Sequence, residues 1–206
     1  RVLNDFKIKK LDILIGTQMI AKGLHFPGVT LVGLINADLG LKMPDFRAPE
    51  RTFQLITQVA GRAGRGDIRG EVLIQTYNPE DETIVYAASQ DFIGFQTFDL
   101  EIRKLLHYPP YTHLMAVHFR GADENKVVEY ANFFAGELRK YAHEEVKIAG
   151  PTKAPIERIK GKYRYMLIIR GNRIKNLRQA AKALIFHHVV PRDVEVYVDV
   201  DAQALL

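Results

Sequence analysis

The chain has 206 residues, of which 47% are hydrophobic and 26% charged, and it carries a formal net charge of +5. This composition indicates a soluble globular protein: no apolar run approaches the roughly 18 residues that span a bilayer, and the N-terminal segment lacks the apolar core of a signal peptide. The absence of cysteine excludes disulfides and leaves only His, Asp and Glu as zinc ligands, whereas the mild basicity permits a polyanionic partner without identifying one.

The first half of the chain predicts strands that alternate with helices. Residues 12–16 (DILIG) form a short apolar run that ends in glycine, which suits a buried parallel strand. Residues 29–36 and 71–77 are two further apolar runs of this kind, and residues 50–59 lack Gly and Pro and suit a helix. Strands separated by helices indicate a parallel sheet with crossover connections.

The second half predicts a different pattern. Helical signals from about Asp91 end at Pro109-Pro110, a rigid stop that suits a boundary. Beyond it we predict strands at 113–119, 146–149, 163–169 and 194–200 and helices at 125–141 and 177–186, with Gly150-Pro151 closing the second strand. The order β-α-β followed by β-α-β is the split βαβ pattern.

The sharpest motif is the run from Gln58 to Arg65 (QVAGRAGR), in which glycine precedes both Arg62 and Arg65. Arginine has a planar fork of donors that suits phosphate oxygens, and it can neutralise the charge that grows during phosphoryl transfer. The plainer alternative is a surface loop of glycine and arginine that forms salt bridges.

A second motif, Gly16 to Gly23 (GTQMIAKG), directly follows the first predicted strand. A turn there places backbone N–H groups and a hydroxyl at the carboxyl edge of the sheet, where ligands of parallel sheets bind. Thr17 then suits contact with a nucleic-acid phosphate, and Lys22 adds charge. Taken alone, such a turn is equally a capped helix start.

In order, spacing and context, the two motifs together resemble motifs V and VI of superfamily-two helicases. A longer set of segments resembles the PriA-type primosomal helicases (primosomal protein N′) in particular, and this resemblance covers essentially the whole chain. The segments are residues 15–27, 45–48 with Glu50 and Arg51, 57–65, Arg103, Pro109-Pro110-Tyr111 and the Gly150-Pro151 turn.

The resemblance implies an α/β fold with two parts. Residues 1–90 are expected to form a truncated RecA-like parallel-sheet helicase lobe, and residues 91–111 a helical connector. Residues 112–206 are expected to form the split βαβ domain, an α+β sandwich. No separate role follows for Asp45, Phe46 and Arg47, beyond a loop that packs on the other lobe.

The resemblance also implies an activity. PriA-type proteins are ATP-driven 3′→5′ DNA helicases that recognise stalled or abandoned forks and reload the replication machinery. By similarity, Arg62 and Arg65 face the ATP γ-phosphate, with Arg65 as the arginine finger, whereas Gln58, Gly61 and Gly64 bind nucleotide.

On the DNA side, the resemblance assigns Gly16, Thr17 and Lys22 to the coupling of the DNA backbone with the nucleotide cleft. The expected partners are branched and single-stranded DNA, the single-strand-binding protein and other primosome proteins. The expected location is the cytoplasm, in association with the nucleoid.

Several family features are absent from the chain, which has no G-x-x-x-x-G-K-[ST] phosphate loop, no DExH-like acidic motif and no zinc-binding cysteines. We therefore interpret it as a fragment that begins inside the second lobe. ATP and Mg²⁺ are expected to be bound mainly by the missing first lobe, and zinc by the full-length family but not by this fragment. The fragment alone is expected not to hydrolyse ATP.

Between Lys153 and Lys182 many basic residues are opposed only by Glu157. This excess charge suits phosphate neutralisation, and we expect Lys160, Lys162 and Arg164 to contact DNA. The alternative is that alternate strand residues simply face water. The nearby Tyr163 and Tyr165 share one strand face with Leu167 and Ile169, which favours a core position over stacking on bases.

Two alternative functions stay open: another superfamily-two fork-remodelling translocase, and a non-enzymatic DNA- or protein-docking module. The segment 45–47 and the split βαβ pattern argue against the first. We expect no metal site, because no acidic partner lies at ligand spacing from the histidines of the second half, His107, His113, His118, His187 and His188.

Overall fold

The computed structural model describes residues 1–17, 26, 28–61, 70–187 and 189–205. The chain forms two compact units. Unit 1 comprises Arg1–Met43 and Arg47–Asp99, and unit 2 comprises Pro44–Phe46 and Leu100–Leu206. The three residues Pro44–Phe46 therefore belong to unit 2, although the residues before and after them belong to unit 1.

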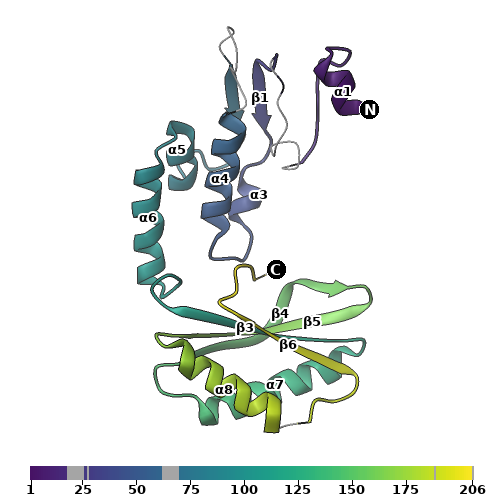
Figure 1. Cartoon of the computed structure of the whole chain (residues 1–206), viewed down its shortest axis with the longest axis vertical. Helices are drawn as coiled ribbons and strands as arrows, with labels where there is room; N and C mark the ends of the chain where they lie inside the picture. Colours follow the sequence, from purple (N-terminus) through teal and green to yellow (C-terminus); the bar gives the residue numbers. More distant parts are fainter. Residues whose placement is uncertain (18–25, 27, 62–69, 188, 206) are drawn as a thin grey trace. The chain divides into compact units, whose positions relative to one another are not determined.

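Unit 1 contains a two-stranded parallel sheet and the helices around it (Figure 1). Leu31 pairs with Glu71 and Leu34 with Ile74, so the two strands run in register over their whole lengths. The elements are α1 (Val2–Lys7), β1 (Leu31–Leu34), α3 (Asp38–Leu41), α4 (Ala48–Ala60), β2 (Glu71–Ile74), α5 (Glu82–Ser89) and α6 (Phe92–Leu105), which continues into unit 2. The predicted α/β lobe with parallel strands is confirmed.

The core of unit 1 is built on one face of α4. Phe53 and Ile56 are three residues apart, so they lie on the same side of the helix, and both are buried. The ring of Phe53 stacks on that of Phe95 with centroids 4.2 Å apart, and Ile84 and Ala87 of α5 complete the cluster. These contacts hold α4 against α5 and α6 within unit 1.

The prediction of a strand at residues 12–16 is wrong. The segment is irregular, and Ile13 and Ile15 are 77% and 90% exposed. A strand exists only through a ladder with a neighbour, and the two strands of the unit 1 sheet pair with each other. An apolar run therefore does not become a buried strand without a partner.

Unit 2 has a four-stranded antiparallel sheet with helices α7 and α8 on one face (Figure 1). Its strand order is β4-β5-β3-β6, which two interleaved β-α-β units produce, so the split βαβ prediction is confirmed. The elements are β3 (His113–Gly121), α7 (Glu124–Tyr141), β4 (Lys147–Ile159), β5 (Lys162–Gly171), α8 (Ile174–His187) and β6 (Val194–Val200).

Strand β4 does not end at Gly150-Pro151 as predicted. It continues to Ile159, and its pairing with β5 shifts register between Ala149 and Thr152. Because β4 is an edge strand of the sheet, a proline there can be accommodated at an irregularity without removing an interior ladder bond.

The two faces of the unit 2 sheet carry different side chains. The helix-covered face holds the main core, in which Phe119 of β3 meets Phe134 of α7 edge to face at 5.4 Å. Tyr165 packs against this core and donates its hydroxyl hydrogen to Glu124 Oε1 at 2.8 Å, as the alternation predicts. On the opposite face, Ala202 and Leu205 of the C-terminal segment cover Leu114, Ala116 and Met166.

None of the helices in the described parts of the chain is both long enough and apolar enough to cross a bilayer.

Candidate nucleotide and nucleic-acid sites

The motif that begins at Gln58 lies at the carboxyl end of α4. Val59 faces the core, whereas Gln58 is exposed on the other side of the helix. Gly61 caps the helix, and its backbone N–H donates to the carbonyl of Thr57 at 3.0 Å. A helix carboxyl end carries partial negative charge and disfavours phosphate. Any phosphate contact at this point therefore needs the arginine side chains that follow.

Four predicted site residues, Arg62, Gly64, Arg65 and Lys22, lie outside the described residues. Gly16 and Thr17 are described, and both are exposed at the end of the irregular segment 11–17. Of the residues assigned to the nucleotide, only Gln58 and Gly61 are described, and neither carries a charge. These two alone do not make a phosphate site.

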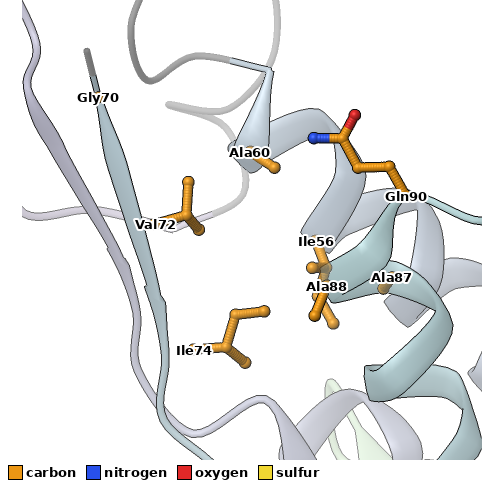
Figure 2. A pocket seen from close by; sticks show the side chains of 8 residues that line it. All are labelled: Ile56, Ala60, Gly70, Val72, Ile74, Ala87, Ala88 and Gln90. Carbon is orange, nitrogen blue, oxygen red and sulfur yellow. The ribbon is translucent and has the colours of Figure 1, made fainter.

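Unit 1 has a cavity of about 310 Å³ between α4, α5 and β2. Figure 2 shows Val72 and Ile74 of β2 on one side and Ile56 of α4 and Ala87 of α5 on the other. The remaining lining residues are Ala60, Gly70, Ala88 and Gln90. None of the lining side chains is charged, so the described walls of this cavity do not suit a phosphate group.

Asp38 is a buried carboxylate that the sequence motifs do not single out. It follows β1 and accepts hydrogen bonds from Thr76 Oγ1 and the backbone N–H of Tyr77, which follow β2, both at 3.0 Å. These bonds hold its pKa below the usual value, with the Tyr77 N–H as the largest cause and the Thr76 hydroxyl also contributing. Asp38 therefore ties the carboxyl ends of the two parallel strands together.

The three predicted DNA-binding residues of unit 2 lie around the β4–β5 hairpin. Lys160 occupies the turn with φ 48°, and its side chain is exposed. Lys162 and Arg164 are on β5 and alternate with Tyr163 and Tyr165, so they project from the sheet face opposite the helices. The structure thus brings Lys162 and Arg164 onto one face and leaves Lys160 at its rim.

Glu195 of β6 is the counter-ion of this face. Its carboxylate forms ion pairs with Lys162 of β5 and with Arg120 of β3. Hydrogen bonds from Lys162 first, and then from Arg120, hold the pKa of Glu195 below its usual value. The positive charge of the face is therefore partly neutralised by an acidic residue well outside the basic run.

An aromatic pair on the same face was missed by sequence reasoning. The rings of His118 on β3 and Tyr197 on β6 stack with centroids 4.5 Å apart and planes 8° from parallel. His118 is buried, and burial lowers its pKa, with the nearby Arg164 charge acting in the same direction. The alternation of β6 places Tyr197 and Glu195 on one face, but it does not reveal which residue of β3 lies opposite.

The segment 44–46 belongs to unit 2. That residues 45–47 pack on the other helicase lobe stays a prediction. The ring of Phe46 stacks on that of Tyr108 at 5.1 Å with planes 5° apart, and the Arg103 guanidinium lies 5.3 Å from the centre of the Phe46 ring. The Asp45 carboxylate accepts the backbone N–H of Leu205 at 3.3 Å. These contacts join the segment to the C-terminal residues of the chain.

Within the described part of the chain, no three or more His, Cys, Asp and Glu side chains gather in a group that could hold a metal ion.

Each half of the chain matches the model of a known protein family. Residues 1–67 match the model of the helicase conserved C-terminal domain, and residues 104–203 match that of the primosomal protein N C-terminal domain. The replication restart protein PriA of Rickettsia felis is 40% identical over 204 residues, which are 99% of this chain and 31% of that protein. PriA of Bacillus subtilis is 42% identical over 188 residues, 91% of this chain and 23% of that protein.

The chain belongs to the PriA family. It spans about a third or less of the length of these curated relatives. The helicase-type lobe and the second domain inferred from sequence are thus parts of one family architecture, and the family resemblance inferred from the motifs is confirmed.

Proposed function

We propose that this chain acts as the C-terminal part of an ATP-dependent 3′→5′ DNA helicase in replication restart and primosome assembly. The supporting observation is the match over nearly the whole chain to replication restart proteins, across both the helicase model and the primosomal model. In this proposal residues 1–90 supply the motif V and VI part of the second lobe, residues 91–111 connect, and residues 112–206 form the accessory domain.

The nucleotide side of the proposal rests on Arg62 and Arg65. When bound, ATP and Mg²⁺ supply the phosphoryl group and part of its charge neutralisation, and the first lobe holds most of both. Arg65 serves as the arginine finger and Arg62 as a second cation, with Gln58, Gly61 and Gly64 beside the nucleotide. The uncharged end of α4 supports this division, because Gln58 and Gly61 bring no positive charge of their own.

The DNA side of the proposal has two parts. Gly16, Thr17 and Lys22 contact the DNA backbone in the lobe, and Lys160, Lys162 and Arg164 contact it in the accessory domain. Branched and single-stranded DNA, the single-strand-binding protein and other primosome proteins are the partners, and the cytoplasm around the nucleoid is the location. The position of Lys162 and Arg164 on a sheet face free of helices supports the second contact.

The test is made in a protein that contains both helicase lobes. Arg65→Ala should lower the DNA-stimulated rate of ATP hydrolysis by about a thousandfold, because an arginine finger contributes about 10³ or more to kcat. Arg173→Ala, which removes an arginine of the accessory domain, is the matched control and should leave that rate unchanged. Near-normal hydrolysis by the Arg65→Ala variant would refute the assignment, as would DNA-stimulated hydrolysis by the 206-residue chain alone.

A further inference from the structure

Among the described residues, one half of the helix-free face of the unit 2 sheet is exposed, as the side chains of Arg120, Glu195 and Tyr197 show; it is called the open half below. The other half is covered by Ala202 and Leu205, together with Phe46 and Tyr108. The strand register places the side chains of the open half beside one another: His118 lies opposite Tyr197, and Arg120 opposite both Glu195 and Arg164. Lys162 projects from the same side of β5.

Tyr197 differs from the core aromatic residues of this domain. Phe119 and Phe134 on the helix-covered side are 0% and 1% exposed, whereas Tyr197 is 41% exposed on β6, an edge strand. His118 is only 6% exposed and supports the Tyr197 ring from one side at 4.5 Å. Tyr197 is therefore held by a buried aromatic neighbour while a large part of its own side chain stays exposed.

Three cations lie on the same sheet face as this ring, and one of them is next to it. The guanidinium of Arg120 on β3 lies 5.6 Å from the centre of the Tyr197 ring. Arg164 and Lys162 lie on β5, on the other side of β3. Glu195 and Asp199 are the carboxylates of this side of β6, so three cations meet two anions. The open half therefore keeps an excess of positive charge around an exposed aromatic ring.

This combination matches the chemistry of a single nucleic-acid strand. An unpaired base presents a flat ring that stacks on an aromatic side chain, and its flanking phosphates pair with cations. In a duplex the base faces are covered by their neighbours in the stack. A sheet that carries its helices on the other face can receive a single strand across several of its β-strands.

We propose that the open half of this face binds single-stranded DNA, with an unpaired base stacked on Tyr197 and flanking phosphates held by Arg120, Lys162 and Arg164. Glu195 is the internal counter-ion that phosphate replaces. The inference deepens the proposed function, since it rests on DNA contact by Lys162 and Arg164 and adds the stacking residue, the strandedness and the competing carboxylate.

The test measures fluorescence anisotropy of the 206-residue chain with a labelled dT oligonucleotide of about 12 nucleotides and with a duplex of equal length. Tyr197→Ala should weaken single-strand binding by about 10-fold or more, since a stacked base contributes about 1–3 kcal/mol. Tyr197→Phe should bind normally. Tyr77→Ala is the matched control, because Tyr77 is 85% exposed in unit 1 and lies outside the face.

Glu195→Gln provides a result that misfolding cannot imitate. Removing the shared carboxylate frees Arg120 and Lys162, so the affinity for the dT strand should rise. Wild-type affinity of the Tyr197→Ala variant, or a duplex bound as tightly as the single strand, would overturn the stacking proposal. If Lys162→Glu still weakened binding in that case, the proposed DNA contact would stand without the stacking on Tyr197. If the wild-type chain bound neither the single strand nor the duplex at low salt, the DNA contact and the stacking proposal would both be refuted.

Discussion

Phe46 offers the most direct test of how the chain is divided. The residue lies in the segment between α3 and α4 of unit 1, yet its ring contacts belong to unit 2, where it stacks on Tyr108 and lies under Arg103. Phe46→Ala removes both interactions and part of the cover over Leu114 and Ala116. The variant should therefore destabilise the C-terminal domain, although residue 46 falls within the helicase-type match at 1–67.

The expected magnitude follows from the burial of the ring. A fully buried Phe→Ala change costs about 3–5 kcal/mol, and Phe46 is half-buried, so about 2 kcal/mol is expected. The lost ring pair alone accounts for about 0.5–1.5 kcal/mol, which is consistent with that figure. For a domain of this size the change corresponds to a fall of roughly 8 °C in Tm.

The assay is hydrogen exchange of the β3 and β5 amides, with thermal unfolding measured in parallel. Phe92→Ala is the control, because Phe92 is 60% exposed on α6 and its removal should lower the free energy of unfolding little. Unchanged protection of β3 and β5 in a folded Phe46→Ala variant would refute the assignment of segment 44–46 to unit 2.

Three further outcomes are expected. Gly121→Ala should destabilise unit 2 in denaturant titrations, because a Cβ there would lie 2.5 Å from the carbonyl oxygen of Asp193. Gly136→Ala in α7 should instead raise the free energy of unfolding by about 0.5–1 kcal/mol, because a Cβ there meets nothing within 4 Å. The pKa of His118 in the folded state lies below its unfolded value of 6.5. The contribution of His118 to the free energy of unfolding is therefore complete above pH 6.5 and is lost as the pH falls below it. The unfolding free energy should therefore drop between about pH 7 and about pH 5.5 more steeply in the wild type than in His118→Gln, and equal slopes would contradict this. If Arg120, Lys162 and Arg164 each replace one counter-ion of a single strand, log K against log salt should have a slope of about −2, and a slope near zero would exclude phosphate contact by these residues.

Local patterns predicted most of the elements, because each depends on neighbours within the same segment. The alternation of Val194–Val200 yields β6 with the predicted bounds, and α7 begins next to its predicted start because Asp123 caps the N–H groups of Asn125 and Lys126. The strand at 12–16 failed for the complementary reason. An apolar run specifies a preference for burial, but it does not supply the neighbouring strand that burial requires.

The candidate site was only partly visible in the sequence, because its key pairs join distant segments. The core position of Tyr165 was predicted correctly from the alternation of a single strand, whereas Tyr163 on the same face lies under the guanidinium of Arg158. The contact between His118 and Tyr197 depends on the register of β3 against β6, which a single sequence does not provide. The same holds for Asp45 and the backbone N–H of Leu205, which meet across almost the whole chain.

The basic run from Lys153 to Lys182 shows why linear charge counts mislead. Lys153 forms ion pairs with Glu157 inside the run and with Glu124 of α7 outside it, and Lys162 pairs with Glu195 of β6. In the folded chain, carboxylates from other elements therefore pair with lysines of a segment that carries only one carboxylate of its own. A phosphate that binds Lys162 must compete with a carboxylate already in place, so the affinity gained there is smaller than the number of lysines suggests. Arg164 instead donates to the carbonyl of Ile156 at 3.2 Å, which leaves its charge without neutralisation by that contact, and it is the stronger candidate for holding a phosphate beside Tyr197.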